Sequence, residues 1–392
     1  MAFAWPGEMW ADVWYLPDED WEAEGKAKVI CDIQEMLTNL SPPQRPRRLI
    51  AFSYTIAPLD RGKTATTALR RMFDVSETLG IPMYVEMATY TWWQSRKDLW
   101  SDPQNVEWTG WSPETAMTEA VRNWGFPFEV APHPFLGSRA YRKAVEEAIR
   151  PMGEEIAKWC AHLQRTGKPQ LFAGMDMDDE INPLNFGLSD EAIKAREYGI
   201  LTHSYLARHG GDPLGILPPK PEGVSEQEWI GQHADWRPDD FDEDAIEAIR
   251  EYLTWQAGIW KETGVPENKM YIHSVPDFAT GLAMSKAAFV PGARPAWSVY
   301  PGWEDVDDMI AQFSAGLKAR GWPPWGVSEF IMGGSEDDIA GAIEKMLSAL
   351  PNNRIFLVQN WDNLVRAWLT SEDEAKVRQG EAFLAAVRKT LL

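Results

Sequence analysis

The stretch Trp325-Gly-Val-Ser-Glu-Phe330 is a short run of strand-forming residues that ends in a glutamate and a phenylalanine. A helix-like segment at 336–349 follows it, and a second apolar run, Ile355-Phe-Leu-Val-Gln-Asn360, comes next. Strand, helix and strand in this order are typical of a βαβ unit, in which the two strands are parallel. The segment from 325 to 360 therefore predicts an α/β fold built on a parallel sheet.

The same alternation extends through most of the chain. Six further strand-like runs are separated by helix-like segments, at 49–55, 82–87, 126–131, 170–176, 269–275 and 296–300. Together with the two runs above they make eight strands, and 392 residues suit a (β/α)8 barrel with insertions. The sequence lacks the glycine-rich phosphate loops G-x-G-x-x-G and G-x-x-x-x-G-K-[ST], which disfavours a doubly wound nucleotide-binding sheet. The predicted fold class is an α/β (β/α)8 TIM barrel.

Two segments do not follow the alternation. Residues 1–47 are predicted to be an N-terminal extension whose helix, at 20–40, packs on a barrel formed by residues 48–392. Residues 181–240 are rich in proline and glycine around 210–223, and Ser189 and Ser225 are helix-capping residues within them. We expect this segment to be a helical and loop subdomain, or a lid, inserted after the fourth strand.

The charge and composition limit the classes of partner. Lys and Arg number 38 and Asp and Glu number 59, so the net charge is −21, which disfavours a nucleic acid or an anionic membrane as partner. No apolar stretch reaches the ~18 residues that a membrane span requires, and the N-terminus is unlike a signal peptide. Two cysteines exclude a disulfide framework and a cysteine-rich zinc module. The predicted location is the cytoplasm, or outside the cell with the signal peptide absent from this sequence.

Polar and aromatic residues gather where the predicted strands end, which is where the active sites of such barrels lie. Following the strands in chain order, they are Glu86, Tyr90, Trp92 and Trp93; His133; Asp176, Asp178, Asp179 and Glu180; His273 and Asp277; Tyr300 and Trp303; Glu329; and Asn360, Trp361 and Asp362.

Two of these carboxylates, Glu180 after the fourth strand and Glu329 after the seventh, suggest glycoside hydrolysis. That reaction needs one carboxyl group to protonate the leaving oxygen and a second to attack the anomeric carbon or activate water. The acid must remain protonated near neutral pH, and crowding by Asp176, Asp178 and Asp179 is one way to raise its pKa. The pair therefore predicts a glycosidase.

With glutamates after strands four and seven, the sequence resembles the clan A glycoside hydrolases, which are retaining (β/α)8 enzymes. Gly326-Val-Ser-Glu-Phe330 is similar to the clan's nucleophile strand, and Asp179-Glu180 to its Asn-Glu pair, with aspartate in place of asparagine. The resemblance implies that Glu180 is the acid/base and Glu329 the nucleophile. It also implies that Asp179 occupies the position of the 2-hydroxyl contact, and it favours β-glycosides of gluco- or galacto-configured sugars.

The aromatic candidates extend the resemblance. Tyr300 resembles the tyrosine that attends the nucleophile, and Trp361 the tryptophan beneath the bound sugar. The chain has 21 tryptophans, and a flat indole suits the face of a sugar ring, although core packing is expected to use about half of them. The predicted substrate-binding residues are Asp178, Asp179, Glu86, His133, His273, Tyr300, Asn360, Trp361, Trp111 and Trp303.

The sequence thus predicts a retaining glycoside hydrolase that acts on a glycoside, an oligosaccharide or a polysaccharide, with no cofactor and no metal. Three alternatives remain open at this stage. One is an inverting glycosidase that uses the same two acids. Another is a metal-dependent hydrolase that uses Asp176, Asp178, Glu180 and His273. The third is a non-catalytic carbohydrate-binding barrel.

Overall fold

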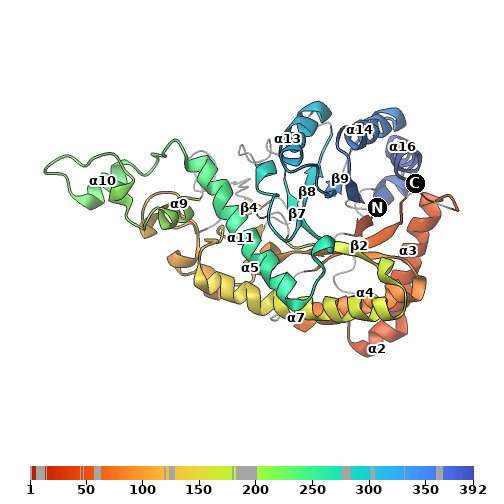
Figure 1. Ribbon diagram of the computed structural model, residues 1–392. Coiled ribbons are helices and arrows are strands. Elements are labelled where there is room, and N and C mark those ends of the chain that lie inside the picture. Colours follow the sequence, from red (N-terminus) through yellow and green to blue (C-terminus); the bar gives the residue numbers. More distant parts are fainter. Residues whose placement is uncertain are drawn as a thin grey trace.

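Eight parallel strands form a closed barrel in the computed structural model (Figure 1). Going round the barrel, the strands are β1 (Ala2–Trp5), β2 (Ala51–Ile56), β3 (Met83–Met87), β6 (Phe172–Asp176), β7 (Met270–Ser274), β8 (Arg294–Val299), β9 (Trp325–Phe330) and β10 (Asn353–Val358). The structure describes residues 2–5, 14, 16–44, 46, 48–56, 63–118, 121–122, 129–178, 181, 201–275, 284–301, 305–330, 332–358 and 365–392. The predicted (β/α)8 barrel is confirmed.

One predicted strand is wrong and one was missed. The described part of the run 126–131 lies outside the barrel, because β5 (Glu129–Val130) pairs antiparallel with β4 (Val121–Arg122) in a separate ribbon. The missing barrel strand is Ala2–Trp5, which pairs with both β10 and β2. The barrel therefore begins before residue 48, and the predicted boundary between an N-terminal extension and the barrel is corrected. The two differences offset each other in the count, so 170–176 and 325–330 remain the fourth and seventh barrel strands.

Long helices cover the outside of the barrel (Figure 1). They are α3 (Lys26–Leu40), α4 (Lys63–Leu79), α7 (Arg139–Arg165), α11 (Phe241–Thr263), α13 (Val306–Ala319), α14 (Glu336–Ala349) and α16 (Glu374–Leu391). Local sequence sets several of their ends. Ser335 and Asp338 form a capping box at the start of α14, and α11 stops at Gly264, whose φ of +98° suits glycine.

Short elements fill the connections. They are α2 (Asp18–Asp20), α5 (Thr89–Gln94), α6 (Lys97–Trp100), α9 (Thr202–Arg208), α10 (Glu226–Gln232), α15 (Ala367–Leu369), the π-helical turn η1 (Trp21–Gly25) and the 3-10 turns η3 (Pro103–Asn105), η4 (Pro113–Thr115), η5 (Pro169–Leu171), η6 (Pro213–Gly215), η7 (Glu267–Lys269) and η8 (Met284–Lys286).

The insertion after the fourth strand has a small hydrophobic core of its own. Its described part, 201–240, carries α9 and α10 and extends away from the barrel (Figure 1). Trp108 and Trp111, from the loop at 105–118, pack there against Tyr205, Leu206, Leu217 and Phe241. Because the two segments share this core, the loop and the insertion form one unit beside the barrel.

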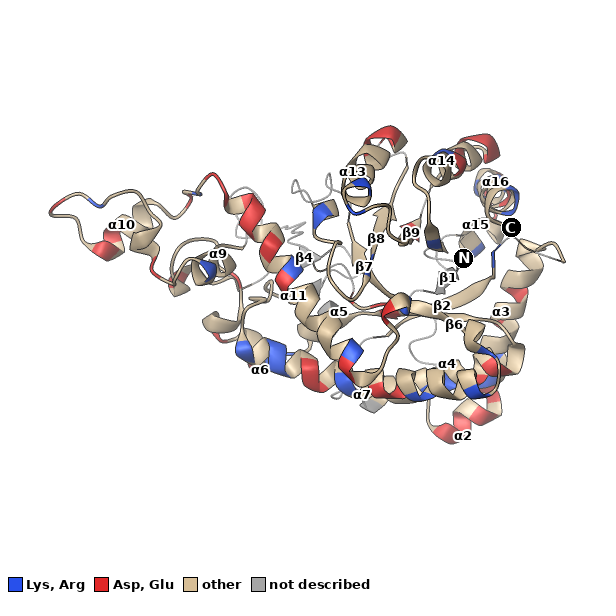
Figure 2. Ribbon diagram, viewed as in Figure 1, with Lys and Arg blue, Asp and Glu red and all other residues tan. Residues whose placement is uncertain are grey.

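Acidic side chains are spread over the outer helices and are dense at the start of α11 (Figure 2). Among the described residues, no helix combines the length and apolar character that crossing a membrane would require.

The amino-terminal half of the barrel interior is apolar. A layer of inward-facing side chains, formed by Ala51, Tyr84, Tyr271, Ala296, Ile355 and Leu357, fills it. Gly326 completes this layer, since a Cβ there would lie 2.3 Å from Ile355 Cγ2. The lower barrel is thus closed by packing, and any chemistry belongs to its other end.

Candidate active site

A polar layer lies directly above the apolar one. Side chains alternate between the two faces of a strand, so the residues two positions beyond Ala51, Tyr84, Tyr271 and Ala296 also face inward. With Asp176 of β6 and Glu329 of β9, the layer consists of Ser53, Glu86, Asp176, His273, Ser298 and Glu329, each at most 5% exposed. Six strands therefore each contribute one polar side chain to this layer, toward the carboxyl end of the barrel.

A β-bulge turns Glu329 into this layer. Gly326 faces the interior, so strict alternation would direct Ser328 inward and Glu329 outward. The pairing of β8 with β9 shifts by one residue, from Trp297↔Val327 to Ser298↔Glu329, which leaves Ser328 as the extra residue. Bulges re-aim side chains in this way next to active sites. Glu329 consequently points inward beside Ser298.

Three groups approach the same oxygen of Glu329. The Tyr300 hydroxyl donates to Oε2, and the Ser298 hydroxyl donates to it over 3.4 Å. His273 Nε2 lies 2.8 Å from Ser298 Oγ and 3.8 Å from Oε2. Since Ser298 donates its proton to Glu329, the network is satisfied when His273 Nε2–H donates to Ser298. Glu329 is held in one orientation by a tyrosine and by a histidine–serine relay.

The other two acids of the layer are also held by hydroxyl groups. Ser53 donates to Glu86 Oε1, and Tyr84 donates to Asp176 Oδ1 over 2.6 Å. Burial, together with the neighbouring Asp176, raises the pKa of Tyr84 well above its ordinary value, so this phenol remains a donor. Glu86 and Asp176 are direct neighbours in the β3–β6 pairing, which makes them an adjacent pair of buried carboxyl groups.

Asp178 connects the end of β6 to two neighbouring helices. It is 2% exposed, and it accepts hydrogen bonds from Thr89 and, over 3.4 Å, from the Tyr252 hydroxyl of α11. Gln256, one turn along α11, donates to the carbonyl of Met177 over 3.2 Å. These bonds fasten the chain leaving β6, so Asp178 helps to orient the segment that leads to Asp179 and Glu180 in the sequence.

Trp111 and His133 lie in segments outside the barrel strands. Trp111 is 1% exposed, donates to the Trp236 carbonyl over 3.0 Å and packs in the core of the insertion, which leaves no indole face for a sugar. His133 follows β5, which is not a barrel strand, and its Nδ1 lies 3.0 Å from the Pro134 carbonyl.

Five predicted site residues lie outside the described residues: Asp179, Glu180, Trp303, Asn360 and Trp361. The structure thus brings together Glu86, His273, Tyr300 and Glu329 from the predicted set. It adds Ser53, Tyr84 and Ser298, which sequence reasoning missed. A spacing in the sequence could have identified them, because each lies two positions from another polar residue on the same strand and so faces the same side, as in Tyr84-x-Glu86 and Ser298-x-Tyr300. Within the described part of the chain, no three metal-ligating side chains converge as a metal site would require.

Comparisons with known proteins do not select a family. No protein-family model matches the chain, and no curated protein matches it. It is similar to the solved structure of D-psicose 3-epimerase with D-tagatose from Clostridium cellulolyticum H10, at 10% identity and a TM-score of 0.40, covering 100% of this chain and 99% of that one.

Two further solved structures are an endogalactoceramidase and the endo-glycoceramidase II from Rhodococcus sp. in a cellobiose-like isofagomine complex. The first has 16% identity, a TM-score of 0.31 and coverage of 85% of this chain and 65% of that one. The second has 11% identity, a TM-score of 0.36 and coverage of 91% and 73%. At TM-scores below 0.5 these likenesses add nothing to the barrel that the strand pairing establishes, so function is argued from the site.

Proposed function

We propose that the chain is a retaining glycoside hydrolase with Glu329 as its nucleophile. The supporting observation is the arrangement around Glu329: a bulge directs it into the barrel, and Tyr300 and Ser298 both donate to its Oε2. A buried carboxylate held this firmly near the carboxyl end of a barrel strand is prepared for attack along one direction.

The reaction would proceed in two displacements. Glu329 attacks the anomeric carbon, the bond from that carbon to the leaving oxygen breaks, and Glu180 gives its proton to that oxygen. Water then attacks the anomeric carbon of the glycosyl-enzyme, Glu180 accepts the water's proton, and Glu329 departs as a carboxylate. The position of Glu180 in the sequence supports its role, since Asp178, two residues earlier, is fastened to α5 and α11.

The substrate class that we propose is a β-glycoside of a gluco- or galacto-configured sugar. Glu86 and His273 lie in the same polar layer as Glu329 and are suited to binding sugar hydroxyls. Asp179, Asn360, Trp303 and Trp361 complete the proposed binding site, with Trp361 stacking beneath the sugar. No residue assigned here requires a metal or a cofactor.

The test is the stereochemistry and the Glu329 dependence of turnover on a panel of 4-nitrophenyl β-glycosides. We expect Glu329→Gln to lower kcat by at least ~10³-fold, because the nucleophile is lost. Azide should restore turnover in Glu329→Ala and yield a glycosyl azide of inverted configuration. Glu344→Gln is the matched control, since Glu344 is exposed on α14.

Proton NMR of the first-formed sugar separates the alternatives. Retention of the anomeric configuration supports the double displacement, whereas inversion would assign the same acids to a single displacement. Turnover abolished by a chelator would indicate the metal-dependent hydrolase. Glycan binding without turnover, equal in the wild type and in Glu329→Gln, would contradict an enzyme and indicate a binding protein.

A further inference from the structure

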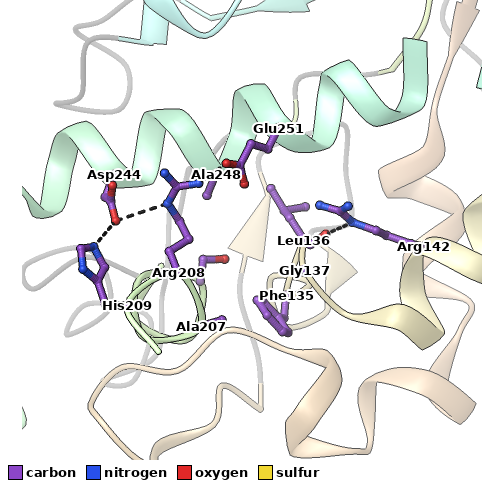
Figure 3. Close-up of a pocket in the computed structure, with 11 residues that line it drawn as sticks. Phe135, Leu136, Gly137, Arg142, Ala207, Arg208, His209, Asp244, Ala248 and Glu251 are labelled. Atoms are coloured by element: carbon purple, nitrogen blue, oxygen red, sulfur yellow. Dashed lines mark hydrogen bonds and ion pairs between the residues drawn. The ribbon is translucent and has the colours of Figure 1, made fainter. Parts of the chain in front are cut away.

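A cavity of about 500 Å³ lies outside the barrel, between α7, α9 and α11 (Figure 3). Its walls come from these three helices and from the loop at 135–137, and none of its lining residues belongs to a barrel strand. Its volume is within the range of small-molecule sites, roughly 300–1,000 Å³. The cavity is therefore separate from the polar layer that contains Glu329.

One wall offers a guanidinium group with spare donors. Arg142 of α7 donates its Nε–H to the Leu136 carbonyl over 2.6 Å, and its guanidinium lies 5.3 Å from the ring centre of Trp255. Among the described residues, no carboxylate lies within ion-pairing distance of it. Burial lowers the pKa of Arg142 below the usual arginine value, although Tyr252 and Glu251 oppose that shift. A half-buried cation that forms no ion pair with the described residues, in a chain of net charge −21, suits an incoming anion.

The facing wall is a network that suits hydroxyl groups. Asp244 of α11 accepts from His209 Nε2 over 2.6 Å and lies 3.3 Å from Arg208 Nε, while Arg208 also pairs with Glu251 (Figure 3). Carboxylate oxygens have several lone-pair positions, so Asp244 and Glu251 can accept further hydrogen bonds. This wall holds one arginine beside two carboxylates, and its polar groups can exchange hydrogen bonds with a neutral polyol.

Apolar side chains complete the cavity. Phe135, Leu136 and Ala248 line it between the two polar walls. A ligand that matches these walls has an anionic group facing Arg142, hydroxyl groups facing Asp244 and Glu251, and an apolar face between them. A sugar acid has these features. We propose that this cavity is a binding site for a small polyhydroxy carboxylate of the size of a hexuronic acid, with its carboxylate on Arg142 and its hydroxyls toward Asp244 and Glu251.

The site is connected to the loop beside the barrel. Ser204 lines the cavity, and both its hydroxyl and its backbone N–H donate to Glu107 of the loop at 105–118. A ligand that orders α9 would therefore stabilise the same contact. Binding is expected to slow hydrogen exchange in residues 105–118 as well as in the walls of the cavity.

Isothermal titration calorimetry with sodium D-glucuronate and with D-glucose, at matched ionic strength, tests the proposal. The wild type should bind glucuronate at least tenfold more tightly than glucose, because a charge-assisted hydrogen bond contributes that much or more. Arg142→Gln should remove this preference. Arg150→Gln, on the same helix and already paired with Glu146 and Glu262, should retain it.

Two further variants make the result decisive. Ala207→Phe fills the cavity from an exposed position on α9, so it tests the site even where Arg142→Gln does not fold. Glu329→Gln should bind glucuronate as the wild type does. Equal affinity for glucuronate and glucose would overturn the proposal. Glucuronate binding that survives Ala207→Phe but is lost in Glu329→Gln would also overturn it, because the ligand would then bind inside the barrel. The proposal does not depend on the glycosidase assignment, since it is measured without turnover.

Discussion

Glu107 should make the contact between the 105–118 loop and the insertion sensitive to pH. The side chain is fully buried and lies against the start of α9, where the Ser204 hydroxyl donates to Oε1 and the Ser204 backbone N–H donates to Oε2 over 3.1 Å. Burial raises the pKa of Glu107 to about 8, although the hydrogen bonds from Ser204 and His203 oppose the shift. In the folded protein it is therefore mostly protonated at neutral pH.

The sign and size of the effect follow from the two pKa values. The unfolded or locally opened state has the ordinary value of 4.5, so between pH 4.5 and about 8 the folded state binds the extra proton. The contribution of Glu107 to the free energy of unfolding or local opening is complete below pH 4.5. It falls as the pH rises, by ~1.4 kcal/mol per pH unit and by about 5 kcal/mol over the whole window. Above about pH 8 the carboxylate is charged in both states and the loss is complete.

Glu107→Gln should remove this dependence. Its amide can donate to Ser204 Oγ and accept from the Ser204 N–H, which reproduces the hydrogen bonds of the protonated acid. Hydrogen exchange of residues 105–118 and 201–208, corrected for the intrinsic rates, measures the local opening free energy at pH 5.5 and 7.5. Over these two pH units the wild type should lose about 2.7 kcal/mol more than the variant.

Glu114→Gln is the control, because Glu114 lies in the same loop but is exposed to solvent. Its pKa is lowered by hydrogen bonding to Ser112, so its small contribution has the opposite sign. Parallel pH profiles for the wild type and Glu107→Gln would refute the reasoning, since they would show that Glu107 is ionised in the folded protein throughout the range.

Three further predictions concern the barrel. Tyr300→Phe should lower kcat by roughly ten- to a hundredfold with little change in the melting temperature, because Glu329 loses one donor; steady-state kinetics and calorimetry check this. Deleting Ser328 should leave Glu329 facing inward, because Glu329 then follows Val327 in strict alternation opposite Ser298; this variant and Ser328→Ala should both retain activity, as turnover of the two proteins will show. Gly326→Ala should cost ~1–3 kcal/mol of stability in urea denaturation, and adding Ile355→Ala should recover part of it, because that side chain occupies the space of the new methyl group.

The sequence was sufficient to predict the barrel because seven of its strands lie next to helices with clear periodicity. It failed at two places for physical reasons. Ala2–Trp5 is only four residues long and its strand character depends on pairing with β2 and β10, which local sequence does not reveal. The run 126–131 has the composition of a strand, yet its described residues pair with 121–122 outside the barrel. Strand propensity shows that a segment is extended and leaves its partner undecided.

The sequence indicated which residue types belong to the candidate site, but it did not indicate how their side chains are directed. A glutamate at the end of an apolar strand was a sound candidate, but its inward direction depends on a one-residue bulge at Ser328 that alternation alone argues against. Tryptophan was ambiguous for a similar reason. An indole suits both a sugar face and a core, and Trp111 proved to be a core residue because the insertion folds over it.

The buried acids of the described structure have one feature in common, which bears on how the proposed site would work. Each accepts a hydrogen bond from the hydroxyl group of a serine, threonine or tyrosine: Glu86 from Ser53, Asp176 from Tyr84, Asp178 from Thr89, Glu329 from Tyr300, and Glu107 from Ser204. An arginine partner would hold a carboxylate ionised, whereas serine, threonine and tyrosine hydroxyls can donate to the ionised form and accept from the neutral acid.

This choice of partner suits a group that must change its charge during a reaction. In the proposed mechanism Glu329 alternates between an anion and a neutral glycosyl ester. A guanidinium bonded to it would stabilise only the anion and would oppose the first displacement by the strength of that ion pair. Tyr300 and Ser298 orient the carboxylate with neutral hydrogen bonds, which cost less to weaken as the ester forms. In the proposed mechanism these two hydroxyl groups would position Glu329 while opposing the loss of its charge only weakly.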